Sequence, residues 1–216
     1  MIVEERLITY LNSLDNGNTL LLAAIEKEAL DAFVPIIRRE TQNLLKLLLA
    51  MNHPKRILEV GTAVGFSALL MEEYNPVPCT ITTIENYDKR IPIAKANFIR
   101  AGKENVIKLI EGDAAVVMEE LTEPYDFIFM DAAKGQYIHF LPHVLRLLQT
   151  GGILVSDNVL QDGDIVESRY AVTRRNRTIH KRMRDYLYEI THVEEFTTSV
   201  LPIGDGVTIS VKKEGK

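Results

Sequence analysis

Residues 56–67 read RILEVGTAVGFS. An apolar run with the length of a buried strand comes first, and a helical pattern begins at Phe66, with Gly61 and Gly65 in the turn between them. Glycines in such a turn let a ligand approach the backbone, at the carboxyl edge where open α/β sheets bind their ligands. The Gly-x-x-x-Gly spacing differs from the Gly-x-Gly-x-x-Gly of pyrophosphate-binding loops, so this stretch alone fits a cofactor loop and a tight structural turn equally well.

The chain beyond this stretch continues the same alternation of short apolar runs and helical patterns. The expected strands are residues 57–60, 80–84, 106–110, 127–130 and 153–156, and the helices between them are residues 66–74, 88–100, 114–121 and 137–148. Strand, helix and strand repeated in this way predict an α/β fold, in which a parallel sheet carries helices on both faces. Right-handed crossovers leave few topologies for such a sheet.

The first fifty residues read as helices. Apolar residues at helical spacing predict one helix over residues 19–33, and Pro35 fits the first turn of a second helix that ends near Asn52. No repeat and no long linker divides the chain. We therefore expect a single domain, residues 1–216, with an N-terminal helical segment (residues 1–54) and a core (residues 55–216).

The end of the chain has a different pattern. A helix is expected over residues 172–190, followed by two β-rich runs over residues 193–200 and 207–211. Gly204-Asp205-Gly206, between the two runs, has the composition of a turn. This arrangement predicts an antiparallel strand pair that closes the sheet.

Composition narrows the class of protein. The 216 residues are 46% hydrophobic and 25% charged, with a net charge of −5. No apolar run approaches the roughly 20 residues of a membrane-spanning helix, and the acidic start of the chain is unlike a signal peptide. Cys79, the single cysteine, cannot form an internal disulfide. We expect a soluble, cytoplasmic protein with neither a membrane nor DNA as partner.

The negative charge is unevenly distributed. Residues 167–185 carry seven cations and two acids, a charge of +5, which leaves −10 for the rest of the chain. Such a segment is either a solvated helix face or a surface for a polyanion. The candidate contacts for RNA are Arg169, Arg174, Arg175, Arg177, Lys181 and Arg182.

Acidic residues end the second and third predicted strands. Glu85 lies 24 residues beyond Gly61, where a carboxylate can accept hydrogen bonds from both hydroxyls of a ribose. Asp113 follows the third strand and is positioned to reach an adenine amino group. Each acid alone is more often a surface or capping residue. Glycine, Glu and Asp at three successive strand ends together favour a nucleoside-type cofactor.

The fourth and fifth predicted strands end in Asp131 and in Asp157-Asn158. Neighbouring strand ends bring these side chains together, and a hard divalent cation relieves the repulsion between two carboxylates. An all-oxygen set suits Mg²⁺, and zinc is disfavoured because no cysteine or histidine joins the group. The alternative is a pair of helix caps. Lys134 follows closely, and a bound cation would disfavour its ammonium form, so it is either a base or a surface partner of Asp131.

Four motifs together resemble those of the cation-dependent O-methyltransferases, the family of the catechol and caffeoyl-coenzyme A enzymes. They are EVGTAVGFS at residues 59–67, DAAKGQY at residues 131–137, DNVL at residues 157–160 and GDGV at residues 204–207. The similarity covers roughly residues 30–213. It implies a Rossmann-like, seven-stranded class I methyltransferase sheet, with S-adenosylmethionine as methyl donor.

The resemblance also implies roles for single residues. Asp131, Asp157 and Asn158 would bind Mg²⁺ or Mn²⁺, and Lys134 matches the family's proposed base, beside Asp131. The implied cofactor-binding residues are Ile37, Glu59, Gly61, Gly65, Ser67, Glu85, Asp113, Ala114 and Asp131.

Within the family, VPI at residues 34–36, DAAKGQY and the arginine-rich segment most resemble the bacterial tRNA 5-hydroxyuridine methyltransferases. The resemblance implies tRNA as the substrate and 5-methoxyuridine at the wobble position as the product. The alternatives are a small catechol or caffeoyl-type acceptor and, from another class, a non-catalytic nucleoside- or RNA-binding module. A dehydrogenase is disfavoured by the glycine spacing. The apolar N-terminal helices predict a homodimer.

Overall fold

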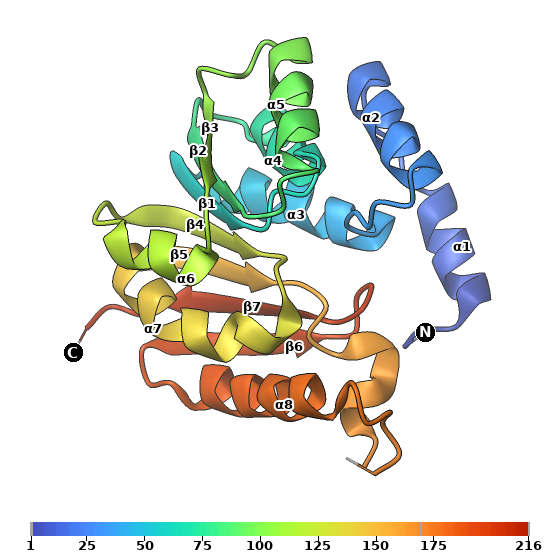
Figure 1. The fold of residues 1–216 in the computed structure, drawn as a ribbon, viewed down its shortest axis with the longest axis vertical. Coiled ribbons are helices and arrows are strands. Elements are labelled where there is room, and N and C mark those ends of the chain that lie inside the picture. The colour runs from blue at the N-terminus through green and yellow to red at the C-terminus, as the bar shows by residue number, and fades with distance from the viewer. Residues whose placement is uncertain (1, 169, 216) are drawn as a thin grey trace.

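A mixed sheet of seven strands forms the centre of the computed structural model, which describes residues 2–168 and 170–215. Its strand order is β3-β2-β1-β4-β5-β7-β6, as Figure 1 shows. The strands are β1 (Arg56–Val60), β2 (Thr80–Glu85), β3 (Ile107–Glu111), β4 (Tyr125–Met130), β5 (Leu148–Ser156), β6 (Phe196–Leu201) and β7 (Val207–Lys212). Strands β1 to β5 pair in parallel, and β7 is antiparallel to both its neighbours. The predicted α/β class and the closing antiparallel pair are confirmed.

Helices cover both faces of the sheet. They are α1 (Glu5–Ser13), α2 (Leu20–Asp31), α3 (Arg39–Asn52), α4 (Phe66–Tyr74), α5 (Ile91–Arg100), α6 (Ala114–Glu120), α7 (Tyr137–Leu147) and α8 (Arg177–His192), with short 3₁₀ helices η1 (Lys134–Gln136) and η2 (Gln161–Val166). Apolar side chains of α2 to α5 form one core with the sheet, and those of α6 to α8 form another on the opposite face.

Alternate residues of the central strands supply the two cores. In β1, Ile57 belongs to the core under α2 to α5, and Leu58 to the core under α6 to α8. Because parallel strands are covered on both faces, such strands read as continuous apolar runs, which is why β1, β4 and β5 are recognisable in the sequence. The N-terminal helices α2 and α3 share a core with the sheet, while α1 buries no side chain.

Two helices begin four or five residues later than the sequence pattern predicts, and α5 begins three residues later. Helix α3 begins at Arg39, so the prediction of a helix from Pro35 is wrong: residues 34–38, named here the strap, connect α2 and α3 without helical structure. Arg38 is extended, with ψ 155°, and the Gln42 Nε2 amide donates to the Ile37 carbonyl oxygen at 3.1 Å. Helix α8 begins at Arg177, five residues later than expected.

No helix in the described part of the chain combines the length and the apolar character needed to cross a membrane.

Candidate active site

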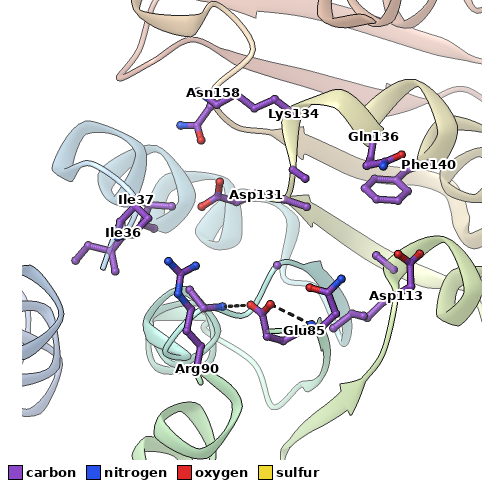
Figure 2. Close-up of a pocket in the computed structure, with 18 of the residues that line it drawn as sticks. Ile36, Ile37, Glu85, Arg90, Asp113, Asp131, Lys134, Gln136, Phe140 and Asn158 are labelled. Atoms are coloured by element: carbon purple, nitrogen blue, oxygen red, sulfur yellow. Dashed lines mark hydrogen bonds between the residues drawn. The ribbon is translucent and has the colours of Figure 1, made fainter. Parts of the chain in front are cut away.

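A cavity of about 620 Å³ opens at the carboxyl ends of the parallel strands, where the sequence predicts the site. The strap forms one wall, and loops that follow β1 to β5 form the others. Figure 2 shows two groups of residues around it. The Glu85 side comprises Ala63, Glu85, Asp113 and Ala114, and the Asp131 side comprises Asp131, Lys134 and Asn158, with Asp157 buried next to Asn158 and not lining the cavity.

Backbone hydrogen bonds orient the carboxylate of Glu85. One oxygen accepts from the Ala63 N–H at 2.8 Å, and the other accepts from the N–H groups of Asn86 and Tyr87 at 3.0 Å each. A carboxylate has about four lone-pair positions, so it keeps acceptor capacity toward the cavity. Binding both hydroxyls of a ribose would require it to give up one backbone partner.

Asp113 lies at the far end of the Glu85 side. Its side chain caps α6 by accepting the Ala115 N–H at 2.9 Å, and both Asp113 and Ala114 line the cavity. Phe140 and Gln136 form the adjoining wall (Figure 2). Gln136 belongs to the DAAKGQY motif but was not predicted as a site residue, and no sequence signal marks Phe140.

Gly61 lines the cavity between the two sides. Its φ of +104° is disfavoured for other residues, and a Cβ at this position would collide with the carbonyl oxygen of Asp131. The Asp131 N–H in turn donates to the Val60 carbonyl at 3.0 Å. The loops after β1 and β4 therefore touch here, backbone against backbone.

Glu59, Ser67 and Gly65 lie behind the Gly61 loop. Glu59 is fully buried, and its two oxygens accept hydrogen bonds from the hydroxyls of Ser67, at 2.5 Å, and Thr83. Burial raises the pKa of Glu59 to about 8, although both hydrogen bonds lower it. Ser67 lines a small cavity beside the main one, while a Cβ at Gly65 would press on the ring of Phe98. Glu59 and Gly65 support the loop from behind, and their contact with a cofactor remains a prediction.

The carboxylates of Asp131 and Asp157 are buried and largely shielded from water. Burial raises the pKa of Asp131 to about 6, with Lys134 lowering it, and burial together with the charge of Asp131 raises the pKa of Asp157 to about 8. Asn158 lines the cavity with a left-handed backbone, φ 61°. The two strand ends are tied by Tyr137, whose hydroxyl lies 3.1 Å from the Met130 carbonyl oxygen and 3.0 Å from that of Asp157.

This donor set fits a hard divalent cation. It consists of two buried carboxylates, of which Asp131 raises the pKa of Asp157, and one amide. All three are oxygen donors, which suits Mg²⁺ or Mn²⁺. The third donor is an amide and not a third acid: within residues 2–168 and 170–215, no cluster of three or more His, Cys, Asp or Glu side chains is placed to hold a metal. Lys134 lies on the same side of the cavity as Asp131 and Asn158 (Figure 2).

Three charged residues of the cavity wall were not predicted. Arg38 comes from the strap, Asp205 from the turn between β6 and β7, and Arg90 from the residue before α5. Asp205 is visible in the sequence as part of the Gly-Asp-Gly motif, where turn chemistry accounts for it. Arg38 is obscured by the incorrect prediction of a helix from Pro35.

The basic segment adjoins the Asp131 side. Arg182 of α8 donates to the carbonyl oxygen of Gly135 at 3.2 Å, next to Lys134 in η1. Arg174 and Arg175 are exposed and have no acidic partner in the described part of the chain. The guanidinium of Arg177 lies 5.9 Å from the ring centroid of Tyr170, Lys181 pairs with Asp185, and Arg169 lies outside the described residues.

A family model described as O-methyltransferase matches residues 13–213 of the chain. The chain belongs to the O-methyltransferase family. Caffeoyl-CoA O-methyltransferase 2 of Populus trichocarpa is 30% identical over 179 residues, 76% of this chain and 70% of that protein. Catechol O-methyltransferase of Niastella koreensis is 34% identical over 127 residues, 57% of this chain and 58% of that protein.

Solved structures agree with this assignment. A Staphylococcus aureus protein assigned as a caffeoyl-CoA O-methyltransferase has 33% identity and a TM-score of 0.86, covering 96% of this chain and 98% of its own. The Podospora anserina methyltransferase PaMTH1, bound to S-adenosylhomocysteine (SAH), has 26% identity and a TM-score of 0.87, covering 97% and 95%. This O-methyltransferase therefore uses S-adenosylmethionine, as predicted, and is not a non-catalytic binding module.

Proposed function

We propose that this O-methyltransferase methylates one of two neighbouring oxygens of its acceptor, with Mg²⁺ or Mn²⁺ held by Asp131, Asp157 and Asn158. The observation that carries the proposal is the pair of desolvated carboxylates with raised pKa beside an amide. When bound there, the cation would neutralise the two carboxylates, hold the pair of acceptor oxygens and lower the pKa of the hydroxyl to be methylated.

The chain's own residues divide the remaining work. We assign the ribose hydroxyls of the methyl donor to Glu85 and its adenine amino group to Asp113, with Gly61 and Ile37 against the donor between them. Lys134 accepts the proton that the acceptor hydroxyl loses as its oxygen attacks the sulfonium methyl group. Holding donor and acceptor in line is worth about 7–11 kcal/mol in well-oriented systems, so positioning contributes more than further acid–base chemistry.

The acceptor we propose is 5-hydroxyuridine at the wobble position of tRNA. Its O4 and 5-hydroxyl are neighbouring oxygens, like those of a catechol. The basic segment beside the Asp131 side supports an RNA acceptor, because exposed arginines such as Arg174 and Arg175 bind phosphates while a pocket reads a splayed base.

A small catechol or caffeoyl-type acceptor is the second candidate. The names of the relatives, caffeoyl-CoA and catechol O-methyltransferases, favour it. It uses the same pair of oxygens and requires nothing of the basic segment. The two candidates therefore share the chemistry of the Asp131 side and differ in the surface around it.

Nucleoside mass spectrometry of tRNA from a deletion strain decides between the two. We expect 5-methoxyuridine to fall and 5-hydroxyuridine to accumulate, and the purified enzyme with S-adenosylmethionine and Mg²⁺ should restore the modification in vitro. Unchanged 5-methoxyuridine, with rapid methylation of a free catechol by the purified enzyme, would establish the second candidate.

A homodimer is proposed from the N-terminal helices. Helix α1 buries none of its side chains and exposes Leu7, Tyr10 and Leu11, and Leu14 follows it. Apolar side chains gathered on one helix favour association with a second copy. Light scattering that returns the mass of one chain, 24.4 kDa, would refute the dimer.

A further inference from the structure

One arginine ties the strap across the mouth of the cavity. Arg38, the last residue of the strap, has a guanidinium nitrogen 3.0 and 3.1 Å from the two carboxylate oxygens of Asp162, and the same nitrogen pairs with Asp205. Asp162 lies in η2, and Asp205 lies in the turn between β6 and β7. A single side chain therefore joins three segments that are far apart in the sequence.

The two acids are held independently of the strap. The N–H groups of Val159 and Leu160 donate to the carbonyls of Gly206 and Asp205, both at 2.9 Å, so backbone hydrogen bonds join the loop after β5 to the β6–β7 turn. A Cβ at Gly206 would collide with the Leu160 side chain, which shows how closely these segments pack. These two segments form the wall to which the Arg38 guanidinium is anchored.

The strap covers the point where the two sides of the cavity meet. Ile36 and Ile37 line both the main cavity and the smaller one beside it, which Gly61 and Asp131 also line. The Gln42 amide holds the strap from α3, and Arg38 holds it from the wall across the cavity. Packing of Ile37 in the core under α2 to α5 also holds the strap, so Arg38 adds a charged contact to a segment that is already packed.

We propose that Arg38 is a positioning residue, whose ion pairs with Asp162 and Asp205 hold the strap closed over the methyl donor. The proposal rests on the methyl donor alone and is independent of the acceptor. The side chains of Arg38, Asp162 and Asp205 are 38%, 47% and 15% exposed, so water screens the ion pairs and the effect on binding is modest. The proposal therefore concerns affinity for the donor and its product, not the chemical step.

The test compares two neighbouring arginines that pair with acids in different parts of the molecule. Arg38→Gln removes the tie across the cavity. Arg39→Gln is the matched control, because Arg39 pairs with Asp15 and Glu26 among the N-terminal helices and does not line the cavity. SAH binding is measured by calorimetry, the KM for S-adenosylmethionine and kcat by steady-state kinetics, and folding by the melting temperature.

For Arg38→Gln we expect about fivefold weaker SAH binding and a matching rise in KM, with kcat kept within twofold. Arg38→Lys, which retains the charge, should recover most of the affinity, and Arg39→Gln should bind SAH like the wild type. Equal losses in the Arg38 and Arg39 variants, or wild-type affinity in Arg38→Gln, would overturn the proposal.

A second variant keeps the test decisive if Arg38→Gln is unstable. Asp162 does not line the cavity, so Asp162→Asn weakens the ion pairs of Arg38 without changing a residue of the cavity wall. About twofold weaker SAH binding is expected, because Asp205 still holds Arg38. Hydrogen exchange of the strap amides in the SAH complex should be faster in Asp162→Asn than in the wild type, and unchanged exchange would contradict the role of Arg38.

Discussion

On the Glu85 side of the cavity, backbone groups of the loops already hold the carboxylates: three N–H groups orient Glu85, and Asp113 caps α6. On the Asp131 side, burial raises the pKa values of Asp131 and Asp157, and the charge of Asp131 raises that of Asp157 further. Hydrogen bonds within the protein therefore already stabilise the carboxylates of the Glu85 side. The other side gains most from a bound cation. With the proposed roles, binding of the methyl donor and activation of the acceptor depend on different physical interactions, so we expect that each can be lost without the other.

The largest effect should come from the Asp131 side. Asp157→Asn removes a charge that a divalent cation would need, so kcat/KM should fall about 1,000-fold, while SAH binding changes less than twofold. Activity assays with and without a chelator, together with calorimetry of SAH, make the measurement. The chelator should reduce wild-type activity to a similar level. A parallel loss of SAH affinity in Asp157→Asn would show that the two sides are not separable.

A substitution on the Glu85 side should have the opposite signature. Glu85→Ala removes the hydrogen bonds we assign to the ribose, so the KM for S-adenosylmethionine should rise about 30-fold, with kcat within threefold of the wild type. The Mg²⁺ concentration for half-maximal activity should not change. Loss of kcat at saturating methyl donor would contradict the assignment of Glu85 to binding.

The basic segment sharpens the comparison from outside the cavity. Replacing Arg174, Arg175 and Arg177 by Gln should raise the KM for tRNA about tenfold and flatten the dependence of log KM on log salt, because fewer counterions are released. Methylation of a free catechol by the same variant provides the control and should be unaffected. Wild-type kinetics on tRNA would remove this segment from the proposed RNA surface.

The smallest effect on activity is expected behind the Gly61 loop. The pKa of Glu59 is about 8 in the folded protein and near the ordinary glutamate value of 4.5 in the unfolded chain. The folded state keeps this proton between those pH values while the unfolded state loses it, so the free energy of unfolding falls as pH rises from about 4.5 to 8. Glu59→Gln should flatten that fall in urea titrations and change SAH affinity less than about threefold, or about 0.65 kcal/mol. An unaltered pH dependence would contradict the buried, protonated carboxyl.

Residues at strand ends could be predicted from the sequence because each short run of strand-forming residues stops at an identifiable position. Gly61, Glu85, Asp113, Asp131 and Asn158 all lie at or just after the ends of predicted strands, and the cavity opens at those ends. Their chemical roles come from the resemblance and remain proposals. Asp157 is also at a strand end, but only the structure shows that it lies behind Asp131 and Asn158 rather than on the cavity wall.

Residues whose positions depend on tertiary contacts were missed. Pro35 gives a valid local signal for the first turn of a helix, but the Gln42 amide and the acids across the cavity hold the strap extended. Arg38 therefore lies on the wall rather than on a helix. Gln136 lies within the DAAKGQY motif, but Phe140 lies on an apolar helical pattern, and only packing brings it to the cavity.

Backbone contact at Gly61 has a consequence for work with synthetic methyl-donor analogues. Because the loops after β1 and β4 touch there, no room for a larger transferable group can be made by trimming side chains at that point. The strap is the wall that side-chain substitutions can reshape, since Ile36 and Ile37 contribute side chains to it rather than a backbone that cannot be shortened. An enzyme that transfers ethyl or allyl groups is best sought by replacing Ile36 with a smaller residue, because Ile37 also belongs to the core and its truncation would destabilise the fold.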